Sequence, residues 1–160
     1  MREIPLRAGL VTLVDDDVYE WASDLKWRVV SNRGNLYAVR GHRSTYLARE
    51  IMGAPRANID HVNGNTLDNR RANLRACSST ENSYNQKKVL GTSSRFKGVT
   101  WDKDIKKWRA MIRFQKRLVH LGSFASEIEA ALVYDRSALG YFRQFARTNA
   151  SMGLLGEVRA

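Results

Sequence analysis

The stretch from residue 60 to residue 85 gathers an imidazole, several carboxylates and a run of carboxamides in a short space. It opens Asp60-His61-Val62-Asn63-Gly64-Asn65 and closes Glu81-Asn82-Ser83-Tyr84-Asn85. So few large apolar side chains cannot form a core of their own, and packing alone does not explain this density of polar groups. The segment therefore predicts a site that binds a metal ion or moves a proton.

The local pattern of this segment predicts two strands and a helix. Residues 59–61 have strand character, residues 63–65 form a turn, and residues 74–77 predict the returning strand. Ser78 and Ser79 are both good N-caps, and Glu81 follows at the spacing of a capping box. This order would bring Asp60, His61 and Asn82 to one place.

These three side chains have the chemistry needed to hydrolyse a phosphodiester. A neutral His61 can accept a proton from water, because the ordinary pKa of imidazole lies near 6.5. Asp60 offers a hard oxygen ligand and Asn82 a second one, which suits Mg²⁺, a cation that keeps water and phosphate in its other positions. Adjacent strand residues point to opposite faces, so a kinked strand end is needed for Asp60 and His61 to share a site. Taken singly, Asp60 and His61 could form a surface hydrogen bond, and Asn82 could be a helix-cap amide.

The segment resembles the His-Asn-His (HNH) nuclease motif found in phage- and intron-encoded homing endonucleases. The matching pieces are Asp60-His61, Asn63-Gly64-Asn65, Asp68-Asn69-Arg70, Asn73-Leu74-Arg75 and Glu81-Asn82-Ser83. The resemblance implies a ββα-metal fold in which Asp60 and Asn82 bind one Mg²⁺, with Mn²⁺ as a possible substitute, and His61 is the general base. It also implies that Asn73 holds the loop and orients His61, although Asn73 alone would be an ordinary turn residue.

Position 48 departs from the family pattern. Relatives usually carry His just before the residue that corresponds to Arg49, and this chain has Ala48. We expect the missing imidazole to impair catalysis without changing the fold. The sequence leaves open whether Ala48 is natural or introduced.

Positive charge is concentrated in the second half of the chain. Residues 1–84 carry 12 Lys and Arg against 10 Asp and Glu, whereas residues 85–160 carry 15 against 6. Such an imbalance predicts a polyanionic partner, most often nucleic acid, although a basic surface kept for solubility is the alternative. The single cysteine, Cys77, excludes an intrachain disulfide and is expected to be buried on a strand. With no signal peptide or apolar run of membrane length, we expect an intracellular protein of a bacterial or phage-infected cell, without a membrane partner.

Before the motif, the pattern predicts a small supporting sheet with one helix. Strands are expected at residues 10–14, 27–30 and 36–40, a helix from Asp17 to Leu25, and a second short helix from Thr45 to Met52. Arg33, Arg40 and Arg43 are possible DNA contacts.

After residue 95 the pattern predicts three strands followed by one helix. The strands are expected at residues 96–101, 107–114 and 117–121, and the helix begins after Ser126 and reaches about Tyr141. Alternation places Trp108, Ala110 and Ile112 toward the helix. The outer face then carries Lys and Arg and suits the major groove of DNA, the alternative being a solvated charged face. The expected inward face of the helix is Ile128, Ala131, Leu132, Asp135, Ala138 and Leu139.

Residues 95–149 resemble the plant ethylene-response-factor (Apetala-type) DNA-binding domain. The matching pieces are Phe96-Lys97-Gly98-Val99, Lys107-Trp108-Arg109-Ala110, Leu121-Gly122-Ser123-Phe124, Glu129-Ala130-Ala131, Tyr134-Asp135 and Phe145-Ala146. The resemblance implies that the outer sheet face binds DNA through Lys97, Thr100, Arg113 and His120, and the residue pattern adds Lys107 and Arg109. Met111 and Leu118 stand where the plant proteins have polar groups, which affects base specificity more than DNA binding.

Together these patterns predict an α+β protein. Its parts would be an HNH nuclease domain at 1–86 (support at 1–45, ββα-metal motif at 46–86), a linker at 87–94, a DNA-binding domain at 95–150 and a tail at 151–160. The expected function is a monomeric, metal-dependent endonuclease of the homing type that acts on double-stranded DNA, with a nick as the preferred product and 3′-hydroxyl and 5′-phosphate ends. The alternative is a sequence-specific DNA-binding regulator with a vestigial nuclease site, which Ala48 favours.

Overall fold

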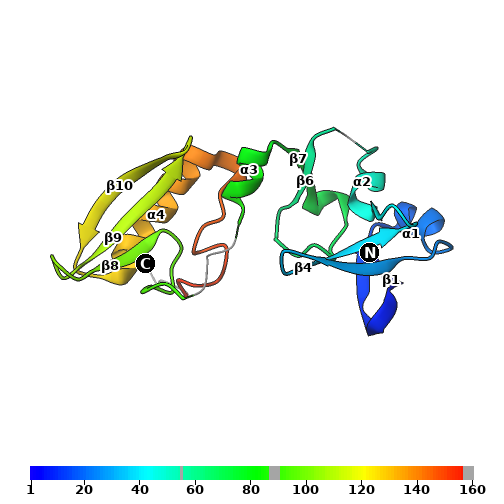
Figure 1. Ribbon diagram of the computed structural model, residues 1–160, viewed down its shortest axis with the longest axis horizontal. Helices are drawn as coiled ribbons and strands as arrows, with labels where there is room; N and C mark the ends of the chain where they lie inside the picture. The colour runs from blue at the N-terminus through cyan, green and yellow to red at the C-terminus, as the bar shows by residue number, and fades with distance from the viewer. Residues whose placement is uncertain (55, 87–90, 157–160) are drawn as a thin grey trace. The chain divides into compact units, whose positions relative to one another are not determined.

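The protein, seen here as a computed structural model that describes residues 1–54, 56–86 and 91–156, divides into two compact units. These are Met1–Asn82 and Ser83–Ala160 (Figure 1). Each is built from small antiparallel sheets and a few helices, which confirms the predicted α+β class. The short helix α3 (Ser79–Tyr84) spans the division, so it contributes residues to both units.

The first unit combines three small sheets with two short helices and α3. Its elements are β1 (Arg2–Pro5), the 3-10 helix η1 (Arg7–Gly9), β2 (Val11–Val14), α1 (Asp16–Ala22), β3 (Arg28–Asn32), β4 (Asn35–Arg40), β5 (Thr45–Tyr46), α2 (Leu47–Ile51), β6 (Asn58–His61), the 3-10 helix η2 (Arg71–Asn73) and β7 (Leu74–Cys77). β1 pairs with β2, β3-β4-β5 form a three-stranded sheet, and β6 pairs with β7. The core beneath them contains Ile4, Leu6, Val14, Val18, Ala22, Trp27, Ala38 and Leu47.

Helix α1 is shorter than the sequence pattern predicts. It starts at Asp16, with acidic residues in its first turn as expected for the positive end of a helix. The carbonyl of Ala22 accepts the backbone N–H of Leu25 at 3.2 Å and the indole N–H of Trp27 at 2.8 Å. Because Trp27 is drawn into the core in this way, the helix ends at Ala22 rather than at Leu25.

The predicted helix from Thr45 to Met52 is wrong at its start. Thr45 and Tyr46 form β5, paired with Arg40 and Val39 of β4, and the helix α2 begins at Leu47. Threonine and tyrosine favour a pleated strand surface, and here a free edge of β4 is available to pair with them.

The second unit is a three-stranded sheet with one helix packed on it, as predicted. β8 (Val99–Asp102), β9 (Lys107–Phe114) and β10 (Arg117–Phe124) lie in the order β10-β9-β8, and α4 (Glu127–Phe142) is followed by the 3-10 helix η3 (Arg143–Phe145). β10 continues three residues beyond the predicted end, since an irregularity in register between His120 and Gly122 lets the strand keep pairing with β9. Ser126 caps α4, as predicted, by accepting the backbone N–H of Glu129.

The predicted inward face of α4 is partly wrong. Its apolar members Ile128, Leu132 and Leu139 are exposed, and the buried residues are Ala130, Ala131, Tyr134, Asp135, Ala138 and Phe142. Small side chains let the helix lie close to the sheet, as expected, and the bulky aliphatic ones therefore face away. A Cβ on Gly98 would lie 1.9 Å from the ring of Tyr134, and Gly98 has a φ of +76°, so only glycine fits this crossing.

The residues around the predicted linker and tail pack onto the second unit. Tyr84 stacks on Phe142 with ring centroids 3.9 Å apart, so the division falls after Asn82 rather than after residue 86. Of the predicted linker, residues 87–90 lie outside the described residues, whereas Ser94 is buried and its Oγ accepts the backbone N–H of Phe96 at 2.9 Å. Leu154 and Leu155, in the predicted tail, pack against the core of this unit.

Candidate functional site

The first candidate site is built on the hairpin of β6 and β7 and on the helix that follows. The strands pair with Asp60 opposite Arg75 and His61 opposite Leu74. α3 starts with the predicted capping box: Glu81 accepts the backbone N–H of Ser78 at 2.8 Å, and its own N–H donates to the Ser78 hydroxyl at 3.2 Å. The predicted strand, turn, strand and helix are thus confirmed as elements.

The long loop between the two strands is fixed by buried polar side chains. Asn73, which is 6% exposed, accepts the backbone N–H of Asn63 at 2.9 Å and donates to the carbonyl of Asp68 at 2.7 Å. The loop is also tied to β2, because Leu13 exchanges backbone hydrogen bonds with Leu67 and Asn69 at 2.9 and 2.8 Å. These bonds hold the loop together with the packing of Leu67 against the core of the first unit.

Asp68 is the buried anion at the centre of this loop. Its carboxylate accepts Nε and Nη2 of Arg70, both at 2.7 Å, and the amide of Asn63 at 2.8 Å. These contacts, those to Arg70 above all, hold the pKa of Asp68 below its ordinary value. Asp68 therefore stabilises the loop through these contacts.

His61 lies in a chain of hydrogen bonds that determines which of its two ring nitrogens carries the proton. Thr12 donates its hydroxyl proton to the carbonyl of Leu67 at 2.7 Å, so it can only accept from the Asn69 amide, at 2.8 Å. That orientation turns the Asn69 Oδ1, an acceptor, toward His61 Nε2 at 3.1 Å. In the neutral ring Nε2 then carries the proton, and Nδ1 is the atom with a lone pair.

The surroundings of His61 favour that neutral ring. The residue is 5% exposed, and the ring of Tyr37 lies edge-on with centroids 6.4 Å apart. Burial lowers the pKa of His61, an effect only partly offset by the hydrogen bond with Asn69. A neutral imidazole at physiological pH is the form that can accept a proton.

Asp60, the neighbour of His61 on β6, has different partners. Its Oδ2 accepts Nε of Arg75 at 2.8 Å and Nη2 at 2.5 Å, across the two strands. Asp60 is 5% exposed, so this ion pair lies largely out of solvent. The convergence of Asp60 and His61 with Asn82 on one site remains a prediction.

The oxygen donors of this region fit a hard divalent cation. Asn82 is half-buried on α3, where its backbone N–H donates to the carbonyl of Ser78 at 3.0 Å. A carboxylate from Asp60 and a carboxamide from Asn82 make a small, oxygen-only set, and Mg²⁺ is typically bound by one or two carboxylates plus water and phosphate. Within residues 1–54, 56–86 and 91–156, no three His, Cys, Asp or Glu side chains cluster as a metal site. Asp60 and Asn82 offer oxygen donors alone, the ligand type that suits Mg²⁺ better than the thiolate and imidazole ligands typical of zinc.

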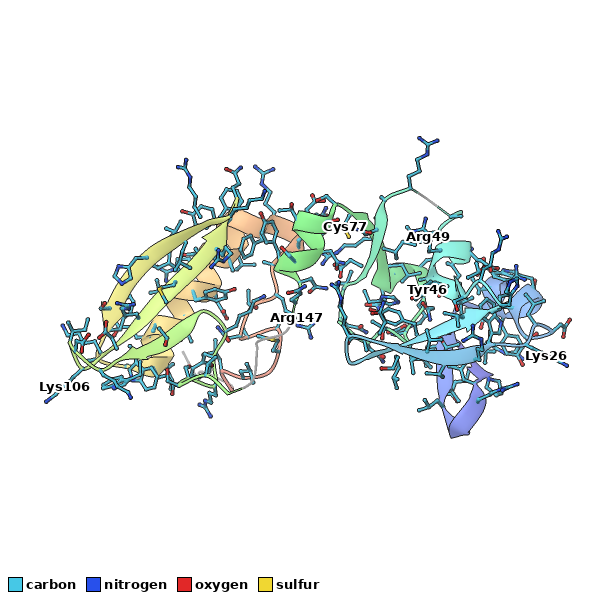
Figure 2. All side chains as sticks on the ribbon, in the orientation of Figure 1. Lys26, Tyr46, Arg49, Cys77, Lys106 and Arg147 are labelled. Atoms are coloured by element: carbon cyan, nitrogen blue, oxygen red, sulfur yellow. The ribbon has the colours of Figure 1, made fainter. Side chains whose placement is uncertain are left out.

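The thiol of Cys77, the single cysteine, has no role in the proposed metal site. Cys77 lies on β7, as predicted (Figure 2). It is 4% exposed, and burial raises its pKa to about 11. A protonated, buried thiol neither binds a metal nor acts as a nucleophile at neutral pH.

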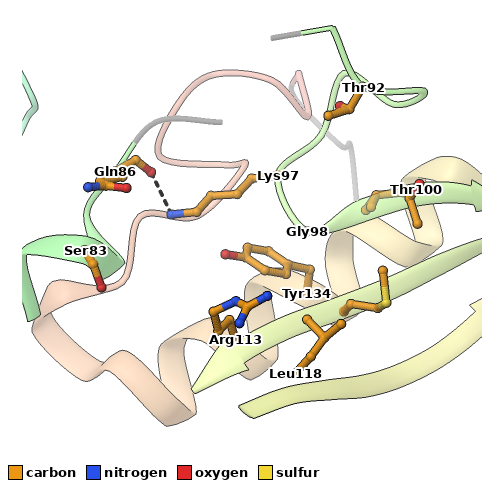
Figure 3. Close-up of a pocket in the computed structure, with 11 residues that line it drawn as sticks. Ser83, Gln86, Thr92, Lys97, Gly98, Thr100, Arg113, Leu118 and Tyr134 are labelled. Atoms are coloured by element: carbon orange, nitrogen blue, oxygen red, sulfur yellow. Dashed lines mark hydrogen bonds between the residues drawn. The ribbon is translucent and has the colours of Figure 1, made fainter. Parts of the chain in front are cut away.

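The second candidate site is the outer face of the β8–β10 sheet. Thr100, Met111, Arg113 and Leu118 line a cavity of about 520 Å³ there, and Figure 3 shows the ring of Tyr134 between the side chains of Lys97 and Arg113, which also line it. The ammonium of Lys97 donates to the carbonyls of Tyr84 and Gln86, both at 2.8 Å. Burial lowers the pKa of Lys97 to about 8. Lys97 therefore ties the chain after α3 to this face.

The other predicted DNA contacts are spread along the same sheet. Lys107, Arg113 and His120 are exposed, and His120 Nε2 lies 3.3 Å from the Ser123 hydroxyl. Arg109 is half-buried and pairs with Asp102 at 2.8 Å. Arg113 is thus the exposed guanidinium on the wall of the cavity.

The partners of the catalytic candidates could not be predicted from local patterns. Asn73 was predicted to hold the loop and to orient His61: its side chain does bond to the loop backbone, whereas Asn69 is hydrogen-bonded to the imidazole. No role was predicted for Arg75 or Thr12. Only the cross-strand register could have indicated Arg75, because position 75 faces position 60 once the hairpin is drawn.

Comparison with known proteins agrees with this site. Residues 54–84 match the family model described as HNH endonuclease, which covers β6, β7 and α3. "Protein 3.8" of Escherichia phage T7 is 39% identical over 54 residues, or 34% of this chain and 45% of that protein. An ethylene-responsive transcription factor-like protein of Arabidopsis thaliana is 53% identical over 32 residues, or 20% of this chain and 14% of that protein. The chain thus spans less than half the length of these curated relatives, and no solved structure matches it.

The family match supports a nuclease of HNH type as the class of protein that this hairpin and helix define. Among the described residues, no helix is long and apolar enough to span a membrane.

Proposed function

We propose that this protein is a metal-dependent DNA endonuclease of the HNH homing type. One observation carries the proposal: Asp60 and His61 end β6 and Asn82 lies on α3, inside the segment that matches the HNH endonuclease model. The basic second unit agrees with double-stranded DNA as the substrate.

In the proposed reaction, His61 takes the proton of the attacking water. Burial keeps its ring neutral, and Asn69 holds the proton on Nε2, so the water would be deprotonated at Nδ1. Asp60 and Asn82 would hold the divalent cation, which when bound neutralises charge on the scissile phosphate and the leaving oxygen. The water oxygen would bond to phosphorus as the bond to the 3′ oxygen breaks, leaving a 5′-phosphate. The 3′ oxygen would take a proton from solvent to become a 3′-hydroxyl, and His61 would return its proton to solvent. One such site in a monomer cuts one strand at a time, so a nick is the expected product.

The second unit would direct the nuclease to DNA. Its outer sheet face presents Lys107, Arg113 and His120 to solvent, as a surface that enters the major groove requires. Thr100, Arg109 and Lys97 complete the proposed face. Lys97 has two of its three ammonium protons on backbone carbonyls, which limits what it can give to a phosphate.

Nicking of supercoiled plasmid with and without Mg²⁺ tests the proposal. Wild-type protein should convert supercoiled to open-circular DNA only when the cation is present, and His61→Ala should lose this activity by a factor of about 100 or more. Equal nicking by both proteins would remove His61 from the mechanism.

A second candidate function is a DNA-binding regulator whose nuclease site is vestigial. Ala48 favours it, because this buried position of α2 has no group that could take part in catalysis. Metal-dependent nicking by the wild-type chain would exclude this candidate, whereas tight, sequence-specific binding without nicking would support it.

A further inference from the structure

We infer that Arg75 is a built-in counter-ion for Asp60 that competes with a divalent cation for the carboxylate and thereby lowers the metal affinity. The inference rests on the proposed function in one respect, namely that Asp60 is a metal ligand. It concerns a residue to which neither the motif nor the family match gives a role.

The geometry of the pair is that of a cation in close contact with a buried anion. Both Nε and Nη2 of Arg75 donate to the same oxygen of Asp60, at 2.8 and 2.5 Å. The side chains are 16% and 6% exposed. In such surroundings a carboxylate with no cation beside it is costly, so Asp60 needs a cationic partner such as Arg75 when no metal ion is bound.

A guanidinium on Oδ2 and a divalent ion on the same carboxylate compete for its negative charge. A divalent ion binds a carboxylate oxygen at about 2.1 Å, which would bring it close to the guanidinium. At such separations like charges repel strongly where water is largely excluded. Metal binding therefore carries the cost of repelling or displacing Arg75, and removing the guanidinium should remove that cost.

The same unit contains a matched pair that separates this role from a purely structural one. Arg70 also donates two N–H groups to a buried carboxylate, that of Asp68, both at 2.7 Å. Asp68 is 1% exposed and is not a proposed metal ligand. Loss of Arg70 should therefore affect stability without changing metal affinity.

The test is calorimetric titration of the full-length protein with Mn²⁺, without DNA. We expect Arg75→Ala to bind Mn²⁺ about tenfold more tightly than wild type, because truncating Arg75 removes the cation that competes with the metal ion for Asp60. Arg75→Lys, which keeps a cation beside Asp60, and Arg70→Ala should both stay close to wild type. Asp60→Asn should weaken binding. Far-UV circular dichroism checks the fold, and Arg75→Gln replaces Arg75→Ala if the alanine variant does not fold.

The outcomes separate this inference from the function on which it rests. If Arg75→Ala and Arg75→Gln bind Mn²⁺ no more tightly than wild type while Asp60→Asn still weakens binding, the counter-ion role is wrong and the metal site stands. If Asp60→Asn binds as wild type does, Asp60 is not a ligand, and both the inference and the proposed metal site are overturned.

Discussion

His61 Nε2 lies 3.1 Å from the carboxamide oxygen of Asn69, and Asn69 donates in turn to Thr12 on β2. A hydroxyl group on a distant strand thereby decides which ring nitrogen of His61 carries the proton. Asn69 is thus a positioning residue for the proposed base, with a readout in the pH dependence of the reaction.

Replacing Asn69 by Asp should move the acid limb of the pH–rate profile to higher pH. In the wild type, burial lowers the pKa of His61 below 6.5, so kcat/KM should fall only at pH values below 6.5. A carboxylate at position 69 would stabilise the imidazolium and raise its pKa. Plasmid nicking over a pH series measures the shift.

Asn69→Leu is the matched control for that experiment. It removes the hydrogen-bond acceptor without adding charge, so kcat/KM should fall. The acid limb of the pH–rate profile should stay at its wild-type pH or move lower, because the hydrogen bond with Asn69 raises the pKa of His61. Identical acid limbs for the wild type and Asn69→Asp would show that His61 is not the titrating base.

Ala48→His should increase the rate of cleavage. Ala48 is 7% exposed on α2, where the family pattern usually has an imidazole. General acid–base groups typically contribute a factor of about 100 or more, so a gain of at least about tenfold is expected even with imperfect placement. Ala48→Asn, a polar side chain without an imidazole, controls for bulk. No gain with His over Asn would contradict the role assigned to this position.

Lys97 and Arg113 should differ in what they contribute to DNA binding. Lys97→Met should lower the thermal stability of the protein, because the carbonyls of Tyr84 and Gln86 lose their donor. Arg113→Met should leave stability nearly unchanged, weaken DNA binding and reduce the slope of log Kd against log salt by about one. Thermal melts and fluorescence anisotropy at several salt concentrations measure both effects. A stronger loss of DNA affinity for Lys97→Met than for Arg113→Met would reverse the assignment.

Asp68→Asn should destabilise the protein at neutral pH by about 1.5–3 kcal/mol, the range for hydrogen bonds to a charged group. Because the folded pKa of Asp68 lies below its ordinary value of 3.8, its contribution is complete above 3.8 and disappears as the pH falls through the folded value. Urea unfolding of wild type and variant at several pH values tests this. The difference in the free energy of unfolding between wild type and Asp68→Asn should become smaller in acid. Asp24→Asn, at an exposed position, is the control and should have the same free energy of unfolding as wild type. A difference in the free energy of unfolding that does not change with pH would show that the Asp68–Arg70 ion pair is not its cause.

The sequence predicted the hairpin and helix of the site well because their determinants are local. The capping box of Ser78 and Glu81 and the alternation in β9 depend on neighbours a few residues apart. The chain-specific partners depend on contacts between distant segments instead. Thr12 and Asn69 are 57 positions apart, and no local pattern links them.

In the second unit, hydrophobicity alone predicted the wrong buried residues on α4. On α4 the largest aliphatic side chains, Ile128, Leu132 and Leu139, were assigned to the core and are exposed. The sheet is approached instead by alanines and by Tyr134, which needs Gly98 beneath it. A helix that lies close to a sheet needs small residues at the contact. A prediction that places the largest apolar side chains in the core therefore turns the wrong face of α4 toward the sheet.

The most direct measurement of the central claim is the anomalous scattering of Mn²⁺ in crystals of the protein soaked with the ion and DNA. The account predicts one peak bonded to the carboxylate of Asp60 and the carboxamide oxygen of Asn82 at about 2.1–2.2 Å, with a phosphate oxygen completing the site. A peak bound elsewhere, or no peak at Asp60 and Asn82 while DNA occupies the crystal, would contradict it.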